Sequence, residues 1–334
     1  ALTSSIIEYP NPGYVRIEKT AEATTTPGKW KINLKVDGKN IPKTTDVVLV
    51  IDDSGSMTSG DKIGSAKTAA KTFVNELLTG STGIRIAVVT INSSGNSGSG
   101  KPQVDAGFTN STATLNTAIN AIVANGGTNI QGGFYAARQL VGTSTADKKV
   151  VILLSDGDPT YSYLTNNAAT ITNNSNNNVN IGFPTAPSCN WWTWNTSRSA
   201  FEAGMTVTSS NYGNIVGNGS SFDYTLYRKK SNDCNDFVAG NHGMPTKYEA
   251  GLLMSEPIKA DVYTIGFEID AGGSGEKTLQ ASQNKGYFPA TTSNISSIYS
   301  QIRNNIAYAA TNAILTDPMS TYIVLESAST PTYS

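Results

Sequence analysis

The sequence predicts an α/β fold in which a mostly parallel sheet lies between two layers of helices. Short apolar runs, typical of buried strands, alternate along the chain with segments that have the periodicity of amphipathic helices. Alternation of this kind predicts parallel strands joined by crossover helices on both faces of the sheet. The expected class is therefore a doubly wound, Rossmann-like sheet.

The apolar runs define the strands, and the periodic segments between them define the helices. We expect strands at residues 47–51, 84–90, 150–154 and 261–269. We expect helices at residues 63–78, 112–123, 130–141, 248–257 and 295–310. The last of these helices closes the predicted domain.

Oxygen-bearing side chains follow the ends of two predicted strands. Asp52 ends the first apolar run, and Ser54 and Ser56 come two and four residues later. Thr128 lies in a Gly-rich turn before a helix, and Asp156 ends a second apolar run. Ligands of open α/β sheets bind beyond the carboxyl ends of the strands. Carboxylate and hydroxyl oxygens suit a hard divalent cation such as Mg²⁺.

These five residues resemble the metal-ion-dependent adhesion site of the von Willebrand factor A domain. That site combines Asp-x-Ser-x-Ser from one loop with a Thr from a second loop and an Asp from a third. The resemblance covers residues 45–310, and it implies that the three hydroxyls bind the cation directly and the two carboxylates partly through water. Mg²⁺, Mn²⁺ and Ca²⁺ all accept such oxygen ligands. The alternative is that these residues only cap helices.

Two further carboxylates, Asp53 and Asp158, lie beside the predicted site. We expect them to be solvated loop charges, because Asp is rarely buried without a partner.

Composition limits the classes of partner. The chain has 334 residues, a formal net charge of −1 and no cluster of Lys or Arg, which argues against nucleic acid and anionic membranes as partners. No apolar run is long enough for membrane insertion. Because both ends look like interrupted strand sequence, we interpret the chain as a piece of a longer protein whose targeting signals lie elsewhere.

Two excursions interrupt the alternation, and we expect them to form arms beside the metal, at residues 92–107 and 159–246. The longer arm contains three tryptophans at residues 191–194, which form either a local core or an exposed recognition patch. It also contains the only cysteines, Cys189 and Cys234, which we expect to pair; the alternative is two free thiols.

The single histidine, His242, argues against a zinc site and against Ser–His–Asp or Cys–His catalysis. No nucleophile–base pair is apparent, so we do not expect an enzyme.

The two ends of the chain have a different pattern from the middle. Residues 14–20 and 29–36 alternate polar and apolar side chains, as half-buried antiparallel strands do, and the tail at 312–325 is also strand-like. We therefore expect residues 1–44 and 311–334 to form one small β-sandwich, with the domain at 45–310 inserted into it.

An A domain with arms inserted into a β-domain resembles the tip adhesins of Gram-positive sortase-assembled pili. This resemblance implies an extracellular virulence protein at a pilus tip on the cell wall. An acidic group of a host extracellular-matrix protein or glycan would complete the cation's coordination, and a pilus backbone subunit would bind regions outside this sequence. The alternatives are a structural pilus or surface-protein subunit whose metal only stabilises loops, and a chelatase-associated enzyme partner.

The β-domains of that family often contain a Lys–Asn isopeptide bond. Here Lys19 shares a strand face with Val15 and Ile17, where burial of an ammonium is costly unless it is paired or neutralised. Asn312 shares a face with Ile314 and is the expected partner. The alternative is that Lys19 extends from the strand end to water.

Overall fold

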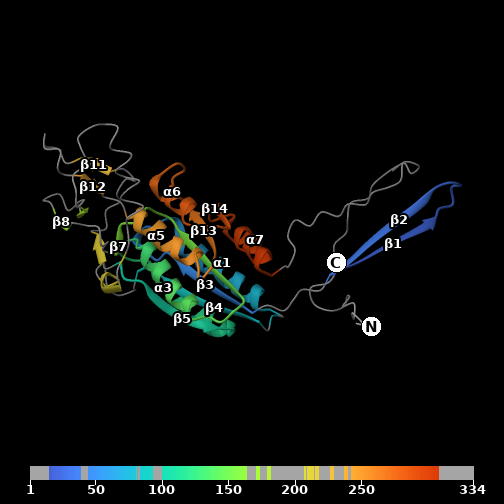
Figure 1. Ribbon diagram of the computed structural model, residues 1–334, viewed down its shortest axis with the longest axis horizontal. Coiled ribbons are helices and arrows are strands. Elements are labelled where there is room, and N and C mark those ends of the chain that lie inside the picture. Colours follow the sequence, from blue (N-terminus) through green and yellow to red (C-terminus); the bar gives the residue numbers. More distant parts are fainter. Residues whose placement is uncertain are drawn as a thin grey trace, which may run out of the picture.

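A six-stranded sheet forms the centre of the protein in the computed structural model (Figure 1). In chain order its strands are β3 (Thr45–Ile51), β4 (Ile84–Thr90), β5 (Gln103–Thr109), β6 (Lys148–Ser155), β13 (Asp261–Phe267) and β14 (Gly286–Ala290). Their spatial order is β14-β13-β6-β3-β4-β5, and every neighbouring pair is parallel except β4 and β5. The predicted doubly wound α/β fold is confirmed.

The structure describes the sheet and its helices almost completely and the long arm only in short pieces. The described residues are 15–38, 44–79, 81, 83–92, 100–163, 171–173, 179–181, 207, 209–213, 215–217, 226–228, 237–239 and 242–307.

The side chains of β3 show why the sheet needs helices on both faces. Val47, Leu49 and Ile51 belong to one apolar core, whereas Val48 and Val50 belong to the other, and all five are buried. Successive side chains of a strand lie on opposite faces, so an uninterrupted apolar run must be covered on both sides.

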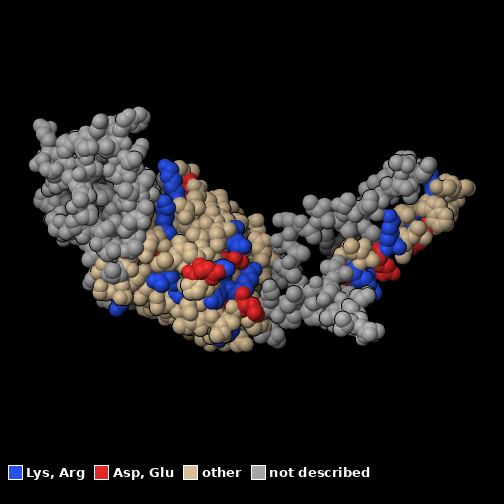
Figure 2. All heavy atoms as spheres, in the orientation of Figure 1, with Lys and Arg blue, Asp and Glu red and all other residues tan. Residues whose placement is uncertain are grey.

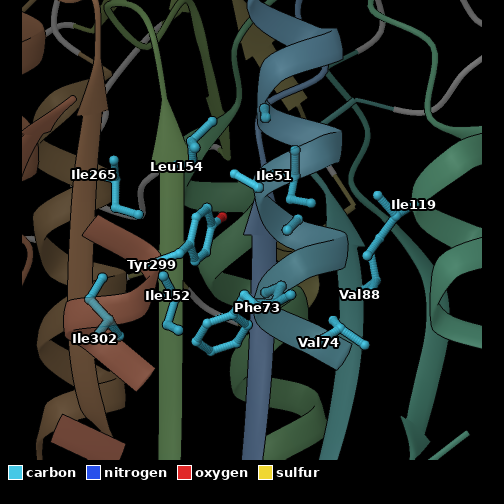
Figure 3. Close-up of a cluster of buried hydrophobic side chains, with 14 of the residues drawn as sticks. Ile51, Phe73, Val74, Val88, Ile119, Ile152, Leu154, Ile265, Tyr299 and Ile302 are labelled. Atoms are coloured by element: carbon cyan, nitrogen blue, oxygen red, sulfur yellow. The ribbon is translucent and has the colours of Figure 1, made fainter. Parts of the chain in front are cut away.

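Three helices supply each apolar core. The first core receives α1 (Lys62–Leu78), α2 (Thr112–Ala121) and α7 (Ile295–Ala307). The second core receives α3 (Ile130–Gly142), α5 (Gly243–Met254) and α6 (Ser274–Ala281). Figure 3 shows the first core, where the rings of Phe73 from α1 and Tyr299 from α7 pack 5.2 Å apart over the sheet. Both rings are almost fully buried.

The prediction of the shorter arm is wrong over part of its length. We expected an excursion at 92–107, but Gln103–Thr109 is strand β5 at the edge of the sheet, antiparallel to β4. Val104 of this strand is 46% exposed, because an edge strand is covered less fully than a central one. The predicted helix at 248–257 instead runs from Gly243 to Met254, and α6 and β14 were not predicted.

The described part of the long arm begins with a small sheet beside α3. The two-stranded sheets there are β7 (Tyr161–Tyr163) with β10 (Ile215–Gly217), β8 (Ile171–Asn173) with β9 (Val179–Ile181), and β11 (Leu226–Arg228) with β12 (Phe237–Ala239). Short 3-10 helix η2 (Ser209–Asn211) precedes Tyr212, whose ring stacks on Tyr135 of α3 at 4.0 Å. These contacts fix the base of the arm to the domain.

The N-terminal strands form the predicted hairpin. β1 (Val15–Ala23) pairs antiparallel with β2 (Trp30–Gly38), and Figure 1 shows this hairpin projecting away from the α/β domain. Lys19 lies opposite Leu34 and is exposed, and Ile17 on the same face is 58% exposed. The expected β-sandwich partner, residues 311–334, lies outside the described residues.

Among the helices of the described ranges, none combines the length and apolarity that a membrane crossing requires.

Candidate metal centre

The order of the strands brings Asp52 and Asp156 together. Asp52 follows β3 and Asp156 follows β6, and these two strands are parallel neighbours with Ile51 opposite Leu154. The backbone N–H of Asp52 continues the ladder by donating to the Leu154 carbonyl at 2.9 Å. Both carboxylates therefore lie at the carboxyl edge of the sheet, as the sequence predicted.

A continuous line of hydrogen bonds joins the two predicted serines to Asp156. The Oγ atoms of Ser54 and Ser56 lie 3.0 Å apart, and Ser56 donates to Asp156 Oδ1 at 2.7 Å. Asp52 accepts from the backbone N–H of Ser54 at 2.8 Å and from the hydroxyl of Ser155 at 2.5 Å. The floor of the site is buried, whereas Ser56 is exposed at its rim.

Thr128 lies in the adjoining loop, and the described contacts link it to the site through the backbone. Gly126 accepts a hydrogen bond from Gly55 N–H at 3.0 Å, which joins this loop to the Ser54–Ser56 loop. A Cβ atom at Gly127 would collide with the ring of Tyr161, so only glycine permits this close approach. The backbone N–H of Thr128 donates to Thr160 Oγ1 at 2.9 Å.

Two charged residues of the site were not predicted correctly. Asp53 was expected to be solvated, but it is buried and accepts from Asn92 N–H at 2.8 Å. Lys62, the first residue of α1, was not predicted as part of the site at all. Its ammonium donates to Asp156 Oδ2 at 2.8 Å.

The electrostatics of the site favour a bound cation. Burial, followed by repulsion from Asp156, raises the pKa of Asp52 to about 6. Burial, followed by the charge of Asp52, raises the pKa of Asp53 to about 8. Both shifts show that negative charge is costly in this position, and a cation between Asp52 and Asp156 would reduce that cost.

The spacing of the hydroxyls fits the geometry of a small divalent cation. Two neighbouring ligands of an octahedral Mg²⁺ at 2.0–2.1 Å are separated by about 2.9 Å. The Oγ atoms of Ser54 and Ser56 are 3.0 Å apart. With Thr128 and water, these two hydroxyls would hold the cation, and Asp52 and Asp156 would supply its countercharge. Within the described ranges, no cluster of three or more His, Cys, Asp or Glu forms another such site.

Three predicted site residues lie beyond what the structure describes. They are Cys189 and Cys234 of the long arm and Asn312 of the tail. Their predicted disulfide and isopeptide bonds therefore stay predictions.

A parallel sheet whose strand ends combine Asp-x-Ser-x-Ser with a second carboxylate defines the class of von Willebrand A-type domains. Residues 46–206 match the family model of the von Willebrand factor type A domain, and this part of the chain is such a domain.

The chain is similar to proteins of bacterial pili. It is 28% identical over 323 residues to the minor fimbrium subunit Mfa5 of Porphyromonas gingivalis, an alignment that covers 87% of this chain and 25% of that protein. The chain thus spans about a quarter of the length of this relative.

Two solved structures share the fold. The crystal structure of the vWF domain of the type V pili tip protein Mfa5 from P. gingivalis has a TM-score of 0.55 at 24% identity, covering 83% of this chain and 99% of that one. The pilus adhesin SpaC from Lactobacillus rhamnosus GG, in its open conformation, has a TM-score of 0.61 at 20% identity, covering 90% of this chain and 34% of that one.

Proposed function

We propose that the chain is the cation-dependent adhesion module of a pilus tip protein at the cell surface. The observation that carries this proposal is the cluster of Asp52, Ser54, Ser56 and Asp156 at the ends of two neighbouring strands. The similarity to Mfa5 and SpaC, which are described as a pili tip protein and a pilus adhesin, supports the pilus assignment. The proposal includes no enzymatic activity.

The burial gradient of the site fits a ligand that arrives from solvent. Asp52 is fully buried and is fixed by Ser54 N–H and Ser155, so it holds its position without a ligand. Ser56 is exposed and marks the open side. When bound, the cation supplies positive charge and a free coordination position, and we propose that an acidic group of the ligand occupies this position.

The surface outside the site offers no strong charge of one sign on the face in Figure 2, where basic and acidic side chains are interspersed. Some charged side chains of the domain are paired, such as Lys285 with Asp261 at 3.2 Å. A surface of this kind contributes little long-range attraction. We therefore assign recognition of a matrix protein or glycan to the cation site.

Attachment to a Gram-positive cell wall is a narrower proposal than location on a pilus. Mfa5 comes from the Gram-negative P. gingivalis, whereas SpaC comes from L. rhamnosus. Similarity to both proteins supports an extracellular pilus tip and is compatible with either cell envelope. We propose attachment by sortase and contact with a pilus backbone subunit as further parts of this narrower proposal.

The test is retention on immobilised collagens, fibronectin and a glycan array in Mg²⁺ and in EDTA. Asp52→Asn keeps the size of the side chain; its oxygen can accept from Ser54 N–H while its NH2 group donates to the Ser155 hydroxyl, so we expect a folded protein that loses Mg²⁺-dependent retention. The matched control is Asp261→Asn, which changes the same group at the opposite end of the sheet, where Asp261 begins β13.

Three outcomes separate the candidate functions. Retention that needs Mg²⁺ in the parent and in Asp261→Asn, and is lost in Asp52→Asn, supports the adhesion module. Retention that persists in EDTA contradicts the cation mechanism. A rise in thermal midpoint on addition of Mg²⁺, without retention on any surface, indicates the alternative structural subunit whose metal only stabilises the loops.

A further inference from the structure

A lysine ammonium already lies at the candidate metal centre. Lys62 Nζ is 2.8 Å from Asp156 Oδ2, and the two side chains are 14% and 0% exposed. Ser56 donates to the other oxygen of the same carboxylate. Both oxygens of Asp156 are therefore engaged, one by a neutral hydroxyl and one by a positive charge.

An unusual backbone path delivers this lysine. The 3-10 helix η1 (Gly55–Asp61) is interrupted at Ser59, and Gly60 and Asp61 both adopt the left-handed conformation, with φ of 59° and 57°. A non-glycine residue in this region is uncommon and locally strained. The strained turn places Lys62 at the start of α1 with its side chain toward Asp156.

The ammonium and a divalent cation make incompatible demands on Asp156. The Ser56 hydroxyl adapts by rotating its hydrogen away, because its lone pairs can then face the cation. The Lys62 ammonium has three donors and no acceptor, and it is positive. It must therefore release Asp156 or remain as a repelling charge beside the cation.

We propose that Lys62 is a built-in competitor of the divalent cation: it neutralises Asp156 in the cation-free site and lowers the affinity for the cation. This inference rests on the proposed function, because it concerns the same site. It assigns to Lys62 the role of setting the cation concentration at which the site fills.

The charge of Lys62 is removed by Lys62→Gln, which keeps an N–H donor for Asp156 and so preserves the fold. We expect Lys62→Gln to bind Mn²⁺ about tenfold to a hundredfold more tightly than the parent, the range implied by one charge-assisted hydrogen bond. Lys62→Arg keeps the charge and should retain an affinity near that of the parent. The matched control is Lys71→Gln, which removes a charge from the same helix. Lys71 Nζ donates to the neutral Asn120 Oδ1 and not to a carboxylate of the site.

The experiment is a calorimetric titration of each EDTA-treated and dialysed protein with Mn²⁺ alone, accompanied by thermal melts with and without Mn²⁺. Lys62→Gln should have a lower midpoint than the parent in EDTA, since Asp156 loses its countercharge, and a larger rise on addition of Mn²⁺. A structural role of Lys62 alone would lower the midpoint without tightening the binding of Mn²⁺.

Each outcome decides between the two proposals. If the parent and Lys62→Gln bind Mn²⁺ equally well, or if Lys62→Gln binds more weakly, the competitor role is overturned and the metal centre stands. If Lys62→Arg binds as tightly as Lys62→Gln, the positive charge is not the cause and the role is also overturned. If none of the four proteins binds Mn²⁺, the proposed metal centre fails and the competitor role with it.

Discussion

Replacing Arg138 by Met tests whether a buried ion pair holds the long arm on the domain. Arg138 of α3 donates to Glu249 Oε1 of α5 at 2.5 Å, and the two side chains are 20% and 0% exposed. Tyr212, from the arm, donates to the other oxygen of Glu249 at 2.8 Å. The guanidinium also lies 5.4 Å from the ring centroids of Tyr135 and Tyr212. The pair thus joins two helices and the arm.

The expected loss of stability follows from the Glu249 carboxylate, which stays buried when Arg138 is removed. Removing one partner of a buried pair typically costs about 3–5 kcal/mol, because the other charge is left uncompensated. The hydroxyl of Tyr212 still donates to Glu249, and the Met side chain can occupy the place of the guanidinium over the two tyrosine rings. We therefore expect Arg138→Met to lower the free energy of unfolding by about 2–4 kcal/mol at neutral pH.

The same variant should have a characteristic pH dependence. Burial raises the pKa of Glu249, and Arg138 opposes this shift. Loss of Arg138 raises that pKa further, so the folded state holds the Glu249 proton more tightly than the unfolded state does. Stability then falls as pH rises from the unfolded pKa through the folded pKa. The defect should be smaller at about pH 5 than at about pH 8.

Urea denaturation at both pH values measures this difference. The raised pKa values of Asp52 and Asp53 affect parent and variant alike, so their contributions cancel in the comparison. The matched control is Arg303→Met, whose partner Glu76 is 40% exposed, and its expected cost is below about 1 kcal/mol. An Arg138→Met defect no larger than that of Arg303→Met, or one that grows on acidification, would refute the reasoning.

Two further predictions concern covalent bonds in which at least one partner lies beyond the described residues. Cys189 and Cys234 should form a disulfide, so the denatured protein should react with a thiol-alkylating reagent only after reduction; alkylation without reductant contradicts the pairing. Lys19 and Asn312 should form an isopeptide bond, which lowers the intact mass by about 17 Da beyond the disulfide's loss of about 2 Da. Lys19→Ala should restore the missing mass and lower the thermal midpoint, whereas a parent protein of full mass leaves Lys19 an ordinary exposed lysine.

The central strands could be predicted because burial on both faces leaves an unmistakable pattern. The runs that became β3 and β6 contain only apolar side chains at their centres, and both faces of the sheet use them. The edge strands lack this pattern. β5 reads Gln-Val-Asp-Ala-Gly-Phe-Thr, and β14 contains a proline that only an edge strand tolerates. Edge strands depend on tertiary pairing that the local sequence does not encode.

The same distinction between local and non-local information applies to the candidate metal centre. Asp52 and Asp156 could be predicted because each follows its own apolar run, and adjacent parallel strands end at one edge. The burial of Asp53 depends on the Asn92 N–H, which belongs to a different loop. The approach of Lys62 depends on left-handed backbone at Gly60 and Asp61; these residue types tolerate that conformation and indicate a turn, but they do not indicate that the turn directs Lys62 to Asp156.

The two carboxylates of the site are held by different kinds of partner, and this asymmetry has a consequence for how the site fills. Asp52 is fixed by a backbone N–H and by the buried hydroxyl of Ser155, neither of which carries a charge. These donors stay in place when a cation arrives, so Asp52 is ready for it. Asp156 is held by the Ser56 hydroxyl and by the long, flexible side chain of Lys62, whose charge would oppose a cation. If Lys62 competes with the cation as proposed, the affinity of the site is set mainly on the Asp156 side, and a single substitution of Lys62 should change that affinity without disturbing the buried Asp52 floor.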